Sequence, residues 1–91
     1  MHAVIVNVTI AADQFEAARK VLQEQTIPRV KQAPGFVKAY WTRSDDGAHG
    51  TSMAVFGTKQ DADNAAKMVP SMVPTGVTVN SVEIKEVVAE A

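Results

Sequence analysis

Residues 3–10 alternate as a β-strand does, yet both faces of that strand would be apolar. A strand of a small antiparallel sheet usually has one apolar face and one solvated face. Helices of the same chain can cover one face, and a second copy of the chain is the cover we expect for the other. Asn7 is the one polar interruption that stands out. The two faces are Val4, Val6, Val8, Ile10 and Ala3, Ile5, Asn7, Thr9.

The chain length makes such uncovered surface costly. With 91 residues, we expect one domain spanning residues 1–91. A domain this small buries only a little over half of its unfolded surface. Each large apolar side chain left in water forgoes about 1.5–3 kcal/mol of burial. We therefore expect a homodimer formed through sheet faces.

Composition excludes several classes of protein. Nine Lys and Arg residues stand against ten Asp and Glu residues, without a basic cluster, which argues against nucleic acid as a partner. The absence of cysteine removes disulfides and thiolate chemistry. No apolar run has membrane-spanning length and no signal-peptide pattern is present, so no membrane partner and a cytoplasmic location are expected.

The order of elements predicts the fold class. Asp13 with Glu16, and Thr58 with Asp61, form capping-box patterns ahead of two helices. Asp46-Gly47 predicts a hairpin turn. The apolar positions of the last strand shift near Asn80, as a β-bulge would cause. The expected elements are a strand at 3–10, a helix from 13 that Pro28 kinks and Pro34-Gly35 ends, strands at 36–43 and 51–57, a helix at 59–69 and a strand at 77–88. This order is βαββαβ, an α+β ferredoxin-like fold with a four-stranded antiparallel sheet.

Joined to that order, residues 27–36 (IPRVKQAPGF), 54–56 and 58–62 make the chain resemble the antibiotic-biosynthesis monooxygenase family. The resemblance implies a dimeric α/β barrel in which two sheets pack face to face. It implies cofactor-independent oxygenation of electron-rich aromatic polyketides or quinols, or haem degradation. It also implies that Asn7 lies between the sheet and the helices.

Haem degradation of the known type is not expected from this resemblance. In that branch an Asn, a Trp and a His surround the ligand, and only Asn7 matches. Phe56 stands where the Trp would be, and residues 59–69 contain no His. His2 and His49 have no second ligand at metal spacing, so we expect neither a metal nor a cofactor.

Seven residues are candidates for the site. Asn7, Tyr40 and Trp41 could hold and orient a ligand, because their polar tips need partners when buried. Asn7 could equally be satisfied by a neighbouring group, and alternation places Tyr40 and Trp41 on opposite faces without showing which one meets the pocket. Phe36 is grouped with Tyr40 by the same alternation. The candidate pocket residues are Phe36, Phe56, Met68 and Met72, for which core packing is the plainer reading.

Three functions remain open from sequence. The first is a cofactor-independent monooxygenase acting on a small electron-rich aromatic molecule, which needs a desolvated pocket with a few polar groups. The second is a non-catalytic dimeric module that binds a small molecule, because a fold does not imply an activity. The third is an RNA-binding module, which the missing basic frame disfavours.

Overall fold

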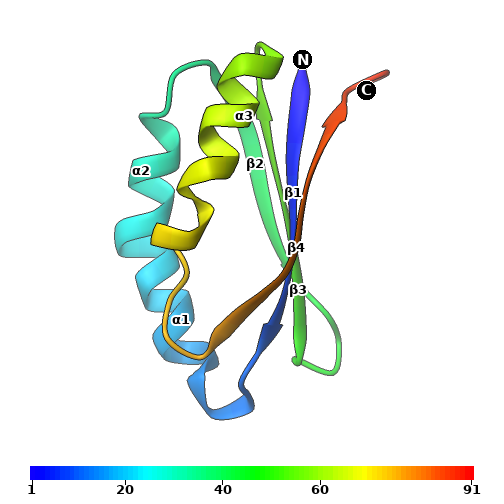
Figure 1. Cartoon of the computed structure of the whole chain (residues 1–91). Helices are drawn as coiled ribbons and strands as arrows, with labels where there is room; N and C mark the ends of the chain where they lie inside the picture. The colour runs from blue at the N-terminus through cyan, green and yellow to red at the C-terminus, as the bar shows by residue number, and fades with distance from the viewer.

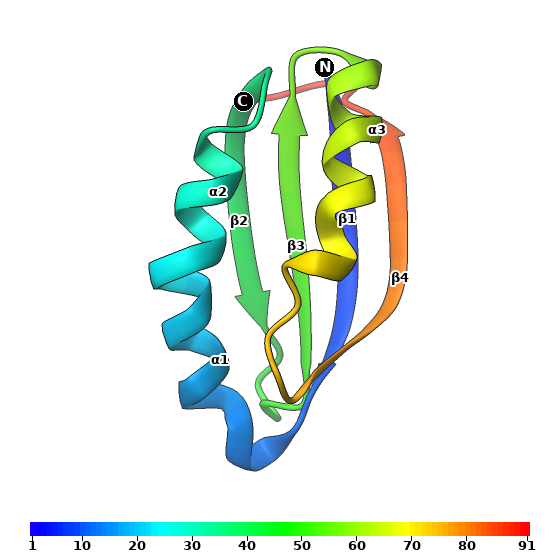
Figure 2. The same cartoon turned by 60° about the vertical axis from the view of Figure 1, so that its left-hand side comes forward.

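The computed structural model describes residues 1–91 and has the predicted βαββαβ order (Figure 1). The four strands are antiparallel and lie in the order β2-β3-β1-β4. Both helical segments cover the same face of the sheet, and the other face is open (Figures 1 and 2). This confirms the ferredoxin-like prediction. The elements are β1 (His2–Ile10), η1 (Ala12–Gln14), α1 (Phe15–Val21), η2 (Leu22–Thr26), α2 (Ile27–Lys31), β2 (Phe36–Arg43), β3 (His49–Phe56), α3 (Lys59–Met68), η3 (Val69–Ser71) and β4 (Val77–Glu86).

The first helical segment runs through α1, η2 and α2 and contains a π-turn. Pro28 has no N–H to donate to the carbonyl four residues earlier. In the π-turn η2, the Ile27 N–H donates to the carbonyl of Leu22, five residues back, and the helix continues past the proline. The predicted helix cap at Asp13 is wrong. Asp13 lies within the 3₁₀ turn η1 that precedes α1, and neither η1 nor α1 has a side-chain cap.

The hairpin and the second helix follow their sequence signals. Gly47 has a φ of 76°, and its N–H donates to the Ser44 carbonyl at 2.9 Å. β3 begins at His49, two residues before the predicted start. The Thr58 hydroxyl accepts a hydrogen bond from the Asp61 N–H at 3.1 Å, which confirms Thr58 as the cap of α3.

Two bulges set which side chains face the helices. Asn7 pairs with Ser81 and Val8 with Val79, so the intervening residue of β4 is extra, as predicted. A second register shift, in β2, was not predicted: Phe36 pairs with Phe56, but Lys38 pairs with Val55. This extra residue brings Phe36 to the helix side of the sheet and corrects its expected grouping with Tyr40.

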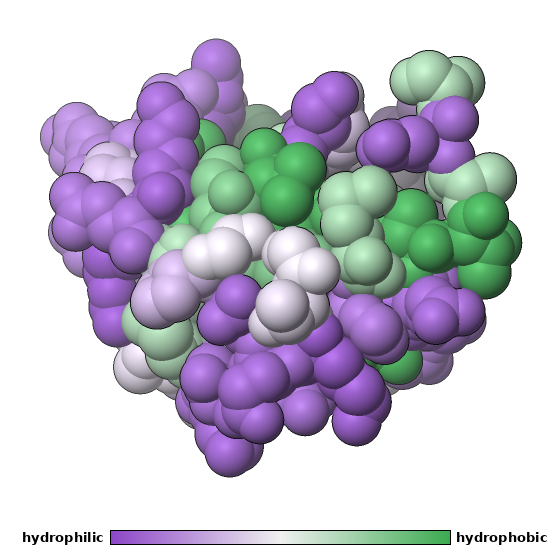
Figure 3. Space-filling view, turned by 90° about the horizontal axis from the view of Figure 1, so that it is seen from above, coloured by the Kyte–Doolittle hydropathy of each residue, from purple (hydrophilic) through white to green (hydrophobic).

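The compact core lies under α3, where Val4, Val6, Phe56 and Ala62 form one buried cluster. Only 9 of 91 residues are buried, so much apolar surface stays accessible. Seen from above, hydrophobic atoms extend to the right-hand edge of the molecule, which is the side of the sheet away from the helices (Figure 3). The strand pattern predicted an apolar face on each side of the sheet.

Candidate functional site: a cavity between helices and sheet

A cavity of about 670 Å³ lies between the sheet and the α1–η2–α2 segment. The helix-facing positions of β1, from Val4 to Ile10, line it, and so do Leu22, Ile27 and Val30 of the helical segment. Its lining is mostly hydrophobic. Drug-sized ligands bind in cavities of this volume and lining, so this is the candidate ligand site.

Aromatic side chains form one part of the wall. Phe36 and Phe56 meet edge to face, with ring centroids 6.0 Å apart and planes inclined by 71°. Trp41 also lines the cavity and pairs across the sheet with Ser52. Because cross-strand partners share a face, the register of β2 places the indole toward the helices. A flat ligand can therefore lie against an aromatic surface.

The polar side chains that line the cavity and make no side-chain hydrogen bond in the structure include those of Gln23, Thr26, Ser52 and Trp41. Thr26 is only 8% exposed, although it comes from the helical segment above the sheet. These polar groups are thus available to a ligand oxygen.

Arg43 is a lining residue that sequence reasoning did not select. Its guanidinium carbon lies 3.4 Å from the centre of the Phe15 ring, and its Nε donates to the Gly47 carbonyl at 3.3 Å. Both Arg43 and Phe15 line the cavity. The signal was present in the sequence, because Arg43 has the same strand parity as Trp41.

Asn7 is not where the resemblance implied. Asn7 Nδ2 donates to Ser81 Oγ at 3.0 Å, and Thr51 Oγ1 donates to Asn7 Oδ1 at 2.7 Å. Its neighbours Val6 and Val8 line the cavity, so Asn7 points to the open face. The expected position between sheet and helices is therefore wrong. Its amide is satisfied by neighbouring strands.

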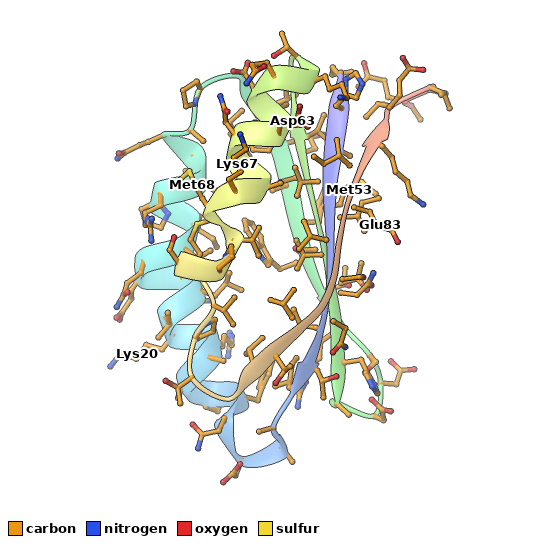
Figure 4. All side chains as sticks on the ribbon, in the orientation of Figure 1. Lys20, Met53, Asp63, Lys67, Met68 and Glu83 are labelled. Carbon is orange, nitrogen blue, oxygen red and sulfur yellow. The ribbon has the colours of Figure 1, made fainter.

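The other candidates divide between the two sides of the sheet. Phe36, Phe56 and Met72 line the cavity, whereas Met68 does not and is 36% exposed on α3. Tyr40 is 60% exposed and pairs with Met53, whose side chain lies on the face away from the helices (Figure 4). Both Tyr40 and Trp41 contribute to the lining of the cavity, but the pairing of Tyr40 with Met53 directs its side chain to the open face, whereas the pairing of Trp41 with Ser52 directs the indole toward the helices.

No histidine lines the cavity, and no group of three His, Asp or Glu side chains could hold a metal ion. His49 lies in the exposed hairpin beside Asp46, with 3.9 Å between Nδ1 and Oδ2. The residues present do not offer an imidazole ligand to a haem iron in this cavity. No helix has the length and apolar character needed to cross a bilayer.

Comparison with solved structures gives the class of fold. Those that resemble the chain include antibiotic-biosynthesis monooxygenases, which confirms at the level of fold the resemblance seen in the sequence. No protein-family model and no curated protein matches the sequence.

Three structures illustrate the likeness. HapK from Hahella chejuensis has a TM-score of 0.76 at 14% identity, covering 100% of this chain and 96% of HapK. The haem degrader MhuD from Mycobacterium tuberculosis, solved with two haems in its active site, has a TM-score of 0.76 at 17% identity, covering 100% and 99%. SnoaB from Streptomyces nogalater, a cofactor-independent oxygenase, has a TM-score of 0.71 at 16% identity, covering 98% and 94%. At these identities the likeness establishes the fold alone.

Proposed function

We propose that this protein is a cofactor-independent monooxygenase acting on a small electron-rich aromatic molecule of quinol or polyketide type. The observation that carries the proposal is the apolar cavity with Trp41, Phe36 and Phe56 in its wall and polar groups beside them. The same fold occurs in SnoaB, which is a cofactor-independent oxygenase. Met72 and Phe15 complete the apolar wall in this proposal.

The chemistry asks little of the protein. A ring methylene flanked by aromatic groups loses a proton to water, since no carboxylate or imidazole lines the cavity, and the resulting anion reduces dioxygen. One oxygen atom becomes a carbonyl on that carbon and the other leaves as water with the two methylene hydrogens, so the substrate supplies all four electrons. A dry site that holds the anion with fixed donors lowers the barrier. The donors assigned here are the Trp41 indole, the Ser52 hydroxyl and the Thr26 hydroxyl.

Oxygen uptake tests the proposal directly. We expect the wild-type protein to accelerate oxygen consumption by 1,8-dihydroxyanthrone, with formation of the anthraquinone. Trp41→Leu and Ser52→Ala should each lower kcat by about tenfold or more, because each removes a donor to the developing anion. Asn7→Ala, on the other side of the sheet, is the matched control. Uptake no faster than in buffer, with anthrones and hydroquinones alike, contradicts the proposal.

A second candidate function is a binding module without catalysis. The observation favouring it is that neither a carboxylate nor an imidazole lines the cavity, so no strong base is available. A quinol that raises Tm but is recovered unchanged after incubation in air would select this function over the first.

We also propose that the protein acts as a cytoplasmic homodimer joined through the open faces of its sheets. The support is the exposed apolar surface there, with Tyr40 60% and Met53 44% exposed. A Tyr or Met left in water on both subunits forgoes burial that a dimer would recover.

A further inference from the structure

The charges around the cavity are of one sign. Arg19, Lys31 and Arg43 line it, and no Asp or Glu does. The whole chain carries ten acidic residues against nine basic ones, so the positive charge of the lining does not simply reflect the composition of the molecule. All ten carboxylates lie elsewhere. Carboxylates approach these cations only from outside the lining: Glu16 lies 3.8 Å from Arg19, and Asp46 interacts electrostatically with Arg43. An apolar cavity with an excess of cations in its lining favours an anion.

Arg43 is held in place for such a role. The guanidinium stacks on the Phe15 ring at 3.4 Å, and Nε is fixed on the Gly47 carbonyl. Asp46 interacts electrostatically with Arg43 but forms no ion pair with it, so the terminal nitrogens of Arg43 can still donate to a ligand. A planar guanidinium binds a carboxylate through two parallel hydrogen bonds, and a fixed one loses less entropy on binding.

Arg19 adds a second cation on the helix that carries Phe15. It follows Phe15 by four residues, so the two side chains share one face of α1. Its only carboxylate partner is Glu16, with 3.8 Å between the charged atoms and both side chains largely exposed. An exposed pair of this length is worth little, so Arg19 can turn to a ligand.

We propose that the ligand of this cavity is a flat apolar molecule bearing a carboxylate. The carboxylate meets Arg43 and Arg19 beside the Phe15 ring, and the ring system lies against Trp41. This deepens the proposed function, on which it rests, by naming the substrate class as aromatic carboxylates. Lys31 and the Thr26 hydroxyl are left to other oxygen atoms of the ring system.

A matched pair of probes tests the charge requirement: anthraquinone-2-carboxylate and anthraquinone-2-carboxamide, which differ in charge and not in shape. By isothermal titration calorimetry we expect the wild-type protein to bind the carboxylate about tenfold more tightly, and the preference to shrink in 0.5 M NaCl. Equal Kd values for the two probes would overturn the proposal.

Variants locate the carboxylate. Arg43→Gln and Arg19→Gln should each reduce the preference several-fold, whereas Lys20→Gln should not. Lys20 neighbours Arg19 but does not line the cavity and points away from the sheet (Figure 4). Because each variant removes one positive charge, an equal effect of Lys20→Gln would mean that net charge alone is responsible. That result would also overturn the proposal.

Further experiments distinguish failure of this ligand proposal from failure of the proposed function. If Arg43→Gln does not fold, Arg43→Lys keeps the charge without the paired donors and should still lower the preference. If the carboxylate is preferred while anthrones are not oxidised, the catalytic proposal fails and the ligand class stands. If anthrones are oxidised and the probes bind equally, the ligand class fails alone.

Discussion

The sequence correctly marked Asn7 as unusual, but the resemblance placed its side chain on the wrong side of the sheet. Its polarity within a valine-rich strand marks it, but alternation gives two faces and no choice between them. The structure resolves the choice through Ser81 and Thr51, which lie opposite it on the neighbouring strands and satisfy its amide. The polar residues of the cavity were harder to find, because Thr26 and Ser52 look like ordinary helix and strand residues in the sequence.

Replacing Asn7 tests this placement. We expect Asn7→Ala to lower the free energy of unfolding by about 1–2 kcal/mol, because one part-buried and one exposed hydrogen bond are lost. Urea denaturation gives the change. Asn64→Ala is the control, because its amide oxygen meets only the exposed Gln60, at 3.2 Å, and little stability should be lost. Equal losses for the two variants would contradict this account of Asn7.

The carboxyl group of Asp46 is a second feature at the scale of single residues. The hydrogen bond from the Ser44 hydroxyl, followed by that from the Ala48 N–H, lowers the pKa of its carboxyl below the ordinary 3.8. The ionised form is therefore favoured in the folded hairpin. Its contribution to stability is complete above the ordinary pKa and is lost as the pH falls through the lowered one.

An NMR titration of the Asp46 carboxyl carbon measures this effect. We expect a midpoint below the ordinary 3.8 of an Asp carboxyl. Ser44→Ala should raise the Asp46 midpoint toward the ordinary value, because the largest cause of the lowering is removed. A midpoint that Ser44→Ala leaves unchanged would show that the hydroxyl is not the cause.

At the scale of elements, the sequence predicted those features that neighbouring residues specify. Strand periodicity, the Thr58 cap, the Asp46-Gly47 turn and the bulge in β4 are all local, and the structure contains each of them. The bulge in β2 left no such trace, because the apolar Phe36 and Val37 can each be buried or exposed. The π-turn arises from strain at Pro28 that the helix absorbs one turn earlier. The face that each residue of the edge strand β2 presents therefore depended on its pairing with β3, which the sequence of β2 alone does not encode.

The junction of α2 with β2 provides an element-scale test. Gly35 has a φ of 77°, and a Cβ there would clash with the carboxyl group of Asp61. We expect Gly35→Ala to cost at least about 1–2 kcal/mol for the left-handed backbone alone. The carboxyl group must also move. Thermal and urea unfolding measure the loss.

Gly57→Ala is the matched control for that variant. The Gly57 N–H donates to the Gly35 carbonyl at 2.8 Å, but its φ is not positive and a Cβ would meet nothing closer than 3.8 Å. We expect a much smaller loss of stability than for Gly35→Ala. Similar losses for the two variants would contradict this account, because position 35 would then be no more restricted than position 57.

At the scale of the whole molecule, the proposed dimer through the open face of the sheet leads to a prediction about assembly. We expect sedimentation equilibrium at micromolar concentration to give a dimer. Met53→Lys should yield monomers with a lower Tm, because the proposed dimer would have to bury the lysine charge against apolar surface. Met68→Lys is the control, since Met68 has a similar exposure of 36% but lies on the helix side of the sheet. A stable wild-type monomer would refute the sheet-to-sheet dimer.

The hollow under the first helical segment has a mechanical consequence. Empty or loosely filled internal space disappears on unfolding, so hydrostatic pressure shifts the balance toward the unfolded chain. Because a cavity of about 670 Å³ lies between the helices and the sheet, we expect this protein to unfold at a lower pressure than a tightly packed domain of its size. A molecule that fills the space would make it stiffer, and high-pressure fluorescence of Trp41 would report the difference.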